Sequence, residues 1–161
     1  MDQPTVVTPQ YSGRCFSDLP KTIRYLLTGN GSPGLDREIL GPVDNRWKKV
    51  VLFFVDAFGW SFCKPRLNDF SFLHQFTELG VAESITAQFP STTAAHVTCI
   101  HTGLSPIESG VFEWQYYEPL VDDIIIPLLF SPVGVRTRNA LDHIEPEQIL
   151  PSQTIYQLNI S

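Results

Sequence analysis

A run of six apolar residues, Val50 to Val55, constrains the fold of this 161-residue chain more than any other feature. Apart from Leu52 the run is β-branched or aromatic, and Asp56 follows it directly. An uninterrupted apolar run of this length is typical of a strand covered on both faces, as in a parallel sheet. The sequence therefore predicts a buried strand that carries a single carboxylate at its carboxyl end.

Helical patterns flank this predicted strand. We expect helices at Asp18–Gly29, at Asp69–Leu79 and at Thr93–His101, with glycines as stop signals. Residues 81–88 are predicted to form the next strand, residues 111–117 and 123–129 to be extended, and residues 146–158 to hold one short helix. The alternation of strands and helices predicts an α/β fold, a parallel sheet flanked by helices.

Composition narrows the possible partners. The net charge is −6, and no cluster of basic residues exceeds the pair Lys48-Lys49, which argues against a nucleic-acid surface. The three cysteines (Cys15, Cys63 and Cys99) lack paired spacing and are predicted to be reduced. With neither a signal peptide nor an apolar run long enough to span a membrane, we expect a cytoplasmic protein.

Two positions carry residues suited to chemistry, and each has a structural alternative. Asp56 is a candidate cation ligand at a strand end, or a turn-forming residue before Gly59. Thr93 follows Ser91 and Thr92 at a predicted helix start, where the helix dipole favours an anion and a hydroxyl can attack phosphorus. One of these three hydroxyls is expected to be the helix cap, and physics alone does not select the nucleophile.

The segments VDAFGW and FPSTTAAHVTCIHTGLSPIESG together resemble the type I phosphodiesterase and nucleotide pyrophosphatase family, part of the alkaline-phosphatase-like superfamily. The resemblance extends from about Tyr11 to Phe130. It implies that Asp56 ligates a metal and that Thr93 is the nucleophile and also a metal ligand. In that family two divalent ions, usually zinc, bridge a phosphate, one activating the threonine and the other the water.

The chain departs from the family pattern at several positions. Ala57 stands in place of the usual glycine, and Ser109 in place of a histidine. Trp114 falls where nucleotide pyrophosphatases carry an asparagine that holds phosphate oxygens, which makes it a candidate substrate-binding residue. With Tyr116 and Tyr117 it could stack on a base or ring; the alternative is that these rings pack against a core.

The remaining metal ligands of the family lie in its carboxyl-terminal half. Asp142-His143 is interpreted as a loop pair, and the other histidines (His74, His96 and His101) as satisfied or exposed. We therefore expect an incomplete alkaline-phosphatase-like fold: residues 1–46 are a lead-in with one helix and a linker, and residues 47–161 are the amino-terminal part of a phosphodiesterase domain. Only part of one metal site would be present.

The resemblance implies a metal-dependent hydrolase of phosphodiester or pyrophosphate bonds that works through a threonine phospho-enzyme intermediate, and we expect this incomplete chain to be inactive or nearly so alone. The expected substrate is a small phosphoester or nucleotide-like molecule. The alternative is a non-catalytic α/β scaffold or binding module. In either case, an unfinished sheet predicts association through its exposed edge strand.

Overall fold

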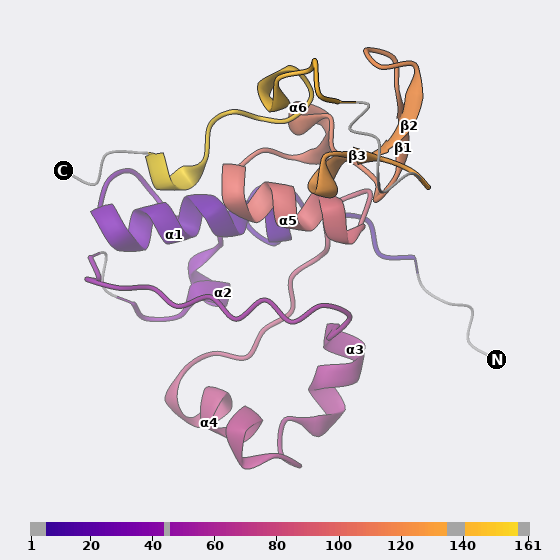
Figure 1. Cartoon of the computed structure of the whole chain (residues 1–161). Coiled ribbons are helices and arrows are strands. Elements are labelled where there is room, and N and C mark those ends of the chain that lie inside the picture. The colour runs from indigo at the N-terminus through magenta and orange to yellow at the C-terminus, as the bar shows by residue number, and fades with distance from the viewer. Residues whose placement is uncertain (1–5, 44–45, 135–140, 158–161) are drawn as a thin grey trace. The chain divides into compact units, whose positions relative to one another are not determined.

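The computed structural model describes residues 6–43, 46–134 and 141–157 (Figure 1). The chain divides into two compact units, the first ending at Ala87 and the second beginning at Gln88. None of the described helices has the length and hydropathy needed to cross a bilayer.

The first unit is built from short helices and loops. Its elements are η1 (Phe16–Asp18), α1 (Leu19–Thr28), α2 (Arg37–Leu40), α3 (Trp60–Cys63), η2 (Lys64–Arg66) and α4 (Ser71–Leu79). Helices α1 and α4 confirm two of the predicted helices. Helix α1 has Pro20 in its first turn, where the missing N–H costs nothing, and stops at Gly29, whose φ of 73° is left-handed.

One buried hydroxyl ties α1 to the loop that follows it. Thr22 is only 3% exposed, and its Oγ1 donates to the Asp18 carbonyl at 2.8 Å. The same oxygen accepts the backbone N–H groups of Gly34 at 3.0 Å and Leu35 at 2.9 Å. A single side chain thus satisfies two loop amides and holds the loop on the helix.

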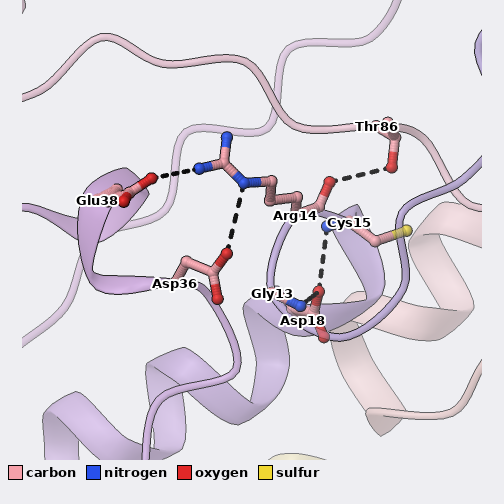
Figure 2. Close-up of polar contacts among 7 residues, drawn as sticks. All are labelled: Gly13, Arg14, Cys15, Asp18, Asp36, Glu38 and Thr86. Atoms are coloured by element: carbon pink, nitrogen blue, oxygen red, sulfur yellow. Dashed lines mark hydrogen bonds and ion pairs between the residues drawn. The ribbon is translucent and has the colours of Figure 1, made fainter.

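The loop before α1 is closed by a carboxylate (Figure 2). Asp18 Oδ2 accepts the backbone N–H groups of Gly13 at 2.7 Å and Cys15 at 3.0 Å. These charge-assisted bonds fix the turn that leads into α1.

Arg14 and Thr86 connect this loop to distant parts of the first unit (Figure 2). The Arg14 guanidinium pairs with Glu38 at 2.6 Å and with Asp36 at 3.4 Å. Thr86 donates its hydroxyl to the Arg14 carbonyl at 3.0 Å, and an isolated parallel bridge pairs Cys15 with Thr86.

The second unit combines helices with a small sheet. Its elements are α5 (Thr93–Thr102), α6 (Pro106–Ser109), β1 (Tyr116–Glu118), β2 (Asp123–Ile126), η3 (Pro127–Leu129), β3 (Ser131–Pro132), η4 (Pro146–Gln148) and η5 (Ile155–Gln157). The three strands are antiparallel in the order β1-β2-β3, with Tyr116 opposite Ile125 and Ile125 opposite Pro132. The buried apolar residues of this unit are Ala94, Ala95, Cys99, Ile100, Val111, Ile125 and Leu141.

Several local predictions hold in this unit. Helix α5 begins at Thr93 and is closed by Gly103 in the left-handed conformation, as its sequence predicts. Strand β2 lies within the segment 123–129 that is predicted to be extended, and β1 overlaps the end of the segment 111–117 at Tyr116 and Tyr117. Asp142 and His143 lie in an exposed turn, and two 3-10 turns replace the single helix expected at residues 146–158.

The predicted parallel sheet is not observed in the described part of the chain. Residues 50–55 form no strand, and most of their side chains are exposed rather than buried; in the segment 81–88 only Thr86 makes a bridge. A strand of a parallel sheet depends on neighbouring strands at its edges and on helices over both faces. Among the described residues, no neighbouring strand pairs with residues 50–55 and no helices cover both of their faces. The side chains of this apolar run therefore remain largely exposed. The result is a set of helices with one small antiparallel sheet.

Candidate functional site

The start of α5 places the candidate nucleophile. Thr92 is the cap of the helix, with extended backbone and a side-chain oxygen that accepts the Ala95 N–H at 3.3 Å. Thr93 is therefore the first helical residue, and it is partly exposed, whereas Ala94 and Ala95 after it are buried. The prediction that one of the three hydroxyls caps the helix is confirmed, and the cap is Thr92.

The Thr92 hydroxyl also fixes the loop that precedes the sheet. It donates to the Phe112 carbonyl at 2.9 Å, while the Thr92 carbonyl accepts the His96 N–H at 3.1 Å. The Phe112 ring stacks on Tyr116, with centroids 4.8 Å apart and planes 21° apart. The loop that carries Phe112 is thereby hydrogen-bonded to Thr92, the residue next to Thr93.

Sequence reasoning missed Gln88, a buried residue that is hydrogen-bonded to the same helix. Gln88 is 1% exposed, and its Nε2 donates to the Ala95 carbonyl at 2.9 Å. Its Oε1 is buried and has no hydrogen-bond partner among the described residues. A glutamine before an apolar-aromatic turn carries no pattern that would predict this burial.

Asp56 lies in an exposed turn of the first unit. Its Oδ1 accepts the N–H of Ala57 at 2.9 Å, a bond within the turn itself. Ala57 has a φ of 57°, the left-handed conformation that glycine adopts most easily. This explains why a glycine suits the position after the aspartate, and why alanine there is strained.

The two candidate residues are described in separate units, Asp56 in the first and Thr93 in the second. Their meeting around one cation stays a prediction, as do their roles. The structure gives the local surroundings of each residue, the turn at Asp56 and the start of α5 at Thr93.

The aromatic stretch after α6 is largely open. Trp114 is 41% exposed and Tyr117 is 55% exposed, whereas Tyr116 is partly covered by its stacking partner Phe112. The packing interpretation therefore fits Tyr116 and does not fit Trp114 or Tyr117. The two exposed rings have surface available for stacking.

Two tyrosines of this stretch have altered acidity. Burial, and then the neighbouring Glu118 carboxylate, raise the pKa of the Tyr116 hydroxyl. Tyr117 donates a hydrogen bond to Asp122 at 2.6 Å, and the loss of that bond on ionisation raises its pKa. Both phenols therefore remain protonated donors at neutral pH.

The histidines have partners or are exposed, as predicted. His96 Nδ1 lies 2.9 Å from the Thr92 carbonyl, and His101 Nδ1 lies 2.8 Å from the Tyr156 hydroxyl. His74 Nε2 lies 3.5 Å from Glu78, a pairing four residues apart that sequence reasoning overlooked.

The described residues do not complete a metal centre. A catalytic zinc ion needs about three protein ligands. No group of three or more histidine, cysteine, aspartate or glutamate side chains suited to a metal occurs in the described part of the chain. Asp56 and Thr93 are two residues, fewer than the three or so protein ligands of a catalytic zinc site.

One comparison with known proteins finds a match, and the matched segment contains both Asp56 and Thr93. The family model described as "Type I phosphodiesterase / nucleotide pyrophosphatase" matches residues 50–125 of the 161-residue chain. The resemblance to this family is confirmed. The matched segment runs from the apolar run before Asp56 to strand β2, and so includes Thr93 and Trp114. Neither a curated protein nor a solved structure matches the chain.

Proposed function

We propose that this chain carries the nucleophile and one metal ligand of a hydrolase that acts on phosphodiester or pyrophosphate bonds. The observation that supports the proposal is the start of α5. There Thr92 takes the role of the cap, which leaves Thr93 as the first helical residue within the matched family segment. The family resemblance assigns the nucleophilic role to the same residue.

The local chemistry of α5 suits a phosphoryl group. The helix dipole places partial positive charge at its amino terminus, and first-turn amides such as that of Ala94 have no intrahelical acceptor. In the proposed reaction Thr93 Oγ1 gives up its proton and forms a bond to phosphorus, while the P–O bond to the substrate's alcohol or phosphate breaks and that leaving group takes up the proton. Water then forms a bond to phosphorus, the P–O bond to Thr93 breaks, and a proton from the water restores the threonine hydroxyl.

Divalent metal, two zinc ions in the complete family site, is part of the proposal. Asp56 would contribute one carboxylate oxygen, and Thr93 its hydroxyl oxygen. We propose that the other ligands come from outside the described residues, among which no group of three or more histidine, cysteine, aspartate or glutamate side chains is suited to a metal. We therefore expect the chain alone to be nearly inactive.

The substrate we propose is a small phosphoester or nucleotide-like molecule. Trp114 stands at a position where the family holds phosphate oxygens, but an indole offers one donor and no acceptor. Its exposed ring, with that of Tyr117, is suited to stacking on a base or another planar group.

Hydrolysis of bis-p-nitrophenyl phosphate tests this function. The rate is measured with excess protein, with and without added zinc, for the unmodified chain and for Thr93→Ala. We expect a slow hydrolysis that requires zinc and falls to the background rate in Thr93→Ala. Ser91→Ala, which removes an exposed hydroxyl from the same turn, is the matched control and should retain the rate.

A rate that is indifferent to zinc and to Thr93, or the absence of any zinc-dependent hydrolysis, would overturn the proposal. The chain would then be better described by the alternative, a non-catalytic module that retains part of the family's scaffold.

A further inference from the structure

The loop after helix α1 contains an asparagine that is followed directly by a glycine. Asn30 and Gly31 are both exposed, and they come after Gly29, the residue at which the helix stops. Of the five asparagines in the sequence, Asn30 is the one that precedes a glycine. Because glycine has no Cβ, its backbone nitrogen can approach the side-chain amide of the preceding residue without steric hindrance. Exposed asparagine is also among the residues that are chemically labile in proteins.

The backbone of this loop is anchored on both sides of the asparagine–glycine peptide bond and not at the bond itself. On the helix side, the Asn30 N–H donates to the Thr28 hydroxyl at 3.1 Å. On the far side, the Gly34 N–H donates to the Thr22 hydroxyl at 3.0 Å. Between these anchors, the Gly31 N–H makes no hydrogen bond to any residue that the structure describes. Rotation of the peptide that joins Asn30 to Gly31 therefore breaks no hydrogen bond of the loop.

The space around Gly31 is open as well. Its φ is 78°, and a Cβ built at this position would meet no atom within 4 Å. The side chain of Asn30 has no hydrogen bond to the described residues, so nothing there holds the carboxamide away from the backbone. The Asn30 carboxamide carbon and the Gly31 nitrogen are therefore both accessible to each other and to water.

Asn68, the other asparagine that the structure describes, is a useful contrast. It is also exposed, and its side chain likewise has no hydrogen bond to the described residues. The next nitrogen along the chain differs, because the Asp69 N–H donates to the Arg66 carbonyl at 3.1 Å. A nitrogen held in this way has to give up that bond before it can react, and it also carries a Cβ beside it. Of these two asparagines, Asn30 alone has an unhindered and unbonded nitrogen next to it.

We propose that Asn30 is a site of spontaneous deamidation. The Gly31 nitrogen gives up its proton and forms a bond to Cγ of Asn30, while the bond from Cγ to Nδ2 breaks and ammonia leaves with that proton. Water then opens the resulting succinimide ring at either of its carbonyl groups. Opening at Cγ gives aspartate, and opening at the backbone carbonyl gives isoaspartate. Water is the co-reactant, and the modification does not depend on the proposed hydrolase function.

Incubation of the full chain in mildly alkaline buffer tests the proposal. Each deamidation replaces a neutral amide by a carboxylate, so ion-exchange chromatography should resolve an acidic species that accumulates with time. Tryptic digestion should place the mass change in the peptide of residues 25–37, which contains Asn30. A protein isoaspartyl methyltransferase should label the same peptide, because ring opening at the backbone carbonyl leaves isoaspartate there.

Three variants of the loop test the chemistry. Asn30→Gln should stop the accumulation of the acidic species, because the longer side chain would have to close a larger ring. Gly31→Ala should slow it about tenfold, because a Cβ beside the nitrogen hinders ring closure. Ser32→Ala changes an exposed side chain of the same loop, so it is the matched control and should keep the rate. Circular dichroism checks that the variants keep their helices.

A second asparagine–glycine pair tests whether the fold contributes. Asp69→Gly creates this pair at Asn68, where the next N–H is bonded to the Arg66 carbonyl. In the folded chain, Asn68 of this variant should deamidate about tenfold more slowly than Asn30, and in denaturant the two rates should become similar. An unchanged peptide 25–37 after incubation, a rate that Asn30→Gln leaves intact, or equal rates at the two positions in the folded chain would each overturn the proposal.

Discussion

At the scale of the residue, Thr22 shows how one side chain can hold a loop. Its hydroxyl satisfies the amides of Gly34 and Leu35 and donates to the Asp18 carbonyl in a nearly solvent-free position. Removing such a partner leaves donors without an acceptor, which costs more than the net gain of an ordinary hydrogen bond.

We therefore predict that Thr22→Val destabilises the chain by about 2–3 kcal/mol, the cost of two unsatisfied amides. Chemical denaturation followed by circular dichroism measures the loss. The control is Thr28→Val on the same helix, which removes a bond to the Arg24 carbonyl and the acceptor of the Asn30 N–H, both in exposed positions where water replaces them, and should cost less than about 0.5 kcal/mol. Equal losses for the two variants would contradict this account of Thr22.

Ala57 is a residue in an unfavourable conformation next to the candidate ligand. A left-handed φ costs a residue with a Cβ about 1–2 kcal/mol, and glycine recovers this at the expense of a more flexible unfolded chain. We predict that Ala57→Gly raises the free energy of unfolding by about 0.5–1 kcal/mol. Ala87→Gly, at an exposed position outside the left-handed region, should instead be neutral or destabilising. A loss of stability in Ala57→Gly would show that the alanine is not strained.

At the scale of the element, the residues at the helix ends explain why the helices could be predicted from the sequence. Helices α1 and α5 both stop at a glycine with positive φ, and α5 starts at a threonine cap. These signals are local, since they depend on residues within one turn of the helix end. They therefore indicate the helices even though the predicted sheet is not observed.

Helix α6 supplies a pH-dependent example. Glu108 accepts hydrogen bonds from the hydroxyl of Ser105 at 2.6 Å and from its backbone N–H at 2.8 Å, and these bonds lower the pKa of the carboxyl group. A lowered pKa means that the stabilisation is present above the ordinary glutamate value of about 4.3 and is lost as the pH falls through the folded-state pKa.

We predict that Glu108→Gln reduces stability at about pH 6 by well under 1 kcal/mol, because the site is exposed, and that this difference is smaller at about pH 3. Thermal unfolding at the two pH values measures it. Glu147 is an exposed glutamate that takes no part in the bonds between Ser105 and Glu108, so Glu147→Gln should change the stability by the same amount at both pH values. A Glu108→Gln effect that is undiminished at low pH would mean that the carboxylate charge is not the cause.

At the scale of the whole molecule, the sequence was a poorer guide. The apolar run at residues 50–55 predicts a covered strand, but coverage depends on partners far away in the chain or outside it, and the run itself carries no information on whether they are present. The antiparallel pairing of β1 with β2 was recognisable only as two extended segments. Asp56 and Thr93 are candidates that their neighbours in sequence suggest, and their roles stay predictions; Gln88 is recognised only through its burial.

The two hydrogen bonds of the Thr92 hydroxyl have a mechanical consequence. The hydroxyl donates its proton to the Phe112 carbonyl, and its oxygen accepts the Ala95 N–H in the first turn of α5. A shift of the loop that carries Trp114 away from the end of the helix that carries Thr93 therefore breaks a hydrogen bond. A molecule that displaced the loop would pull on the residue beside the proposed nucleophile, so that occupancy of one place would be felt at the other through a single hydroxyl.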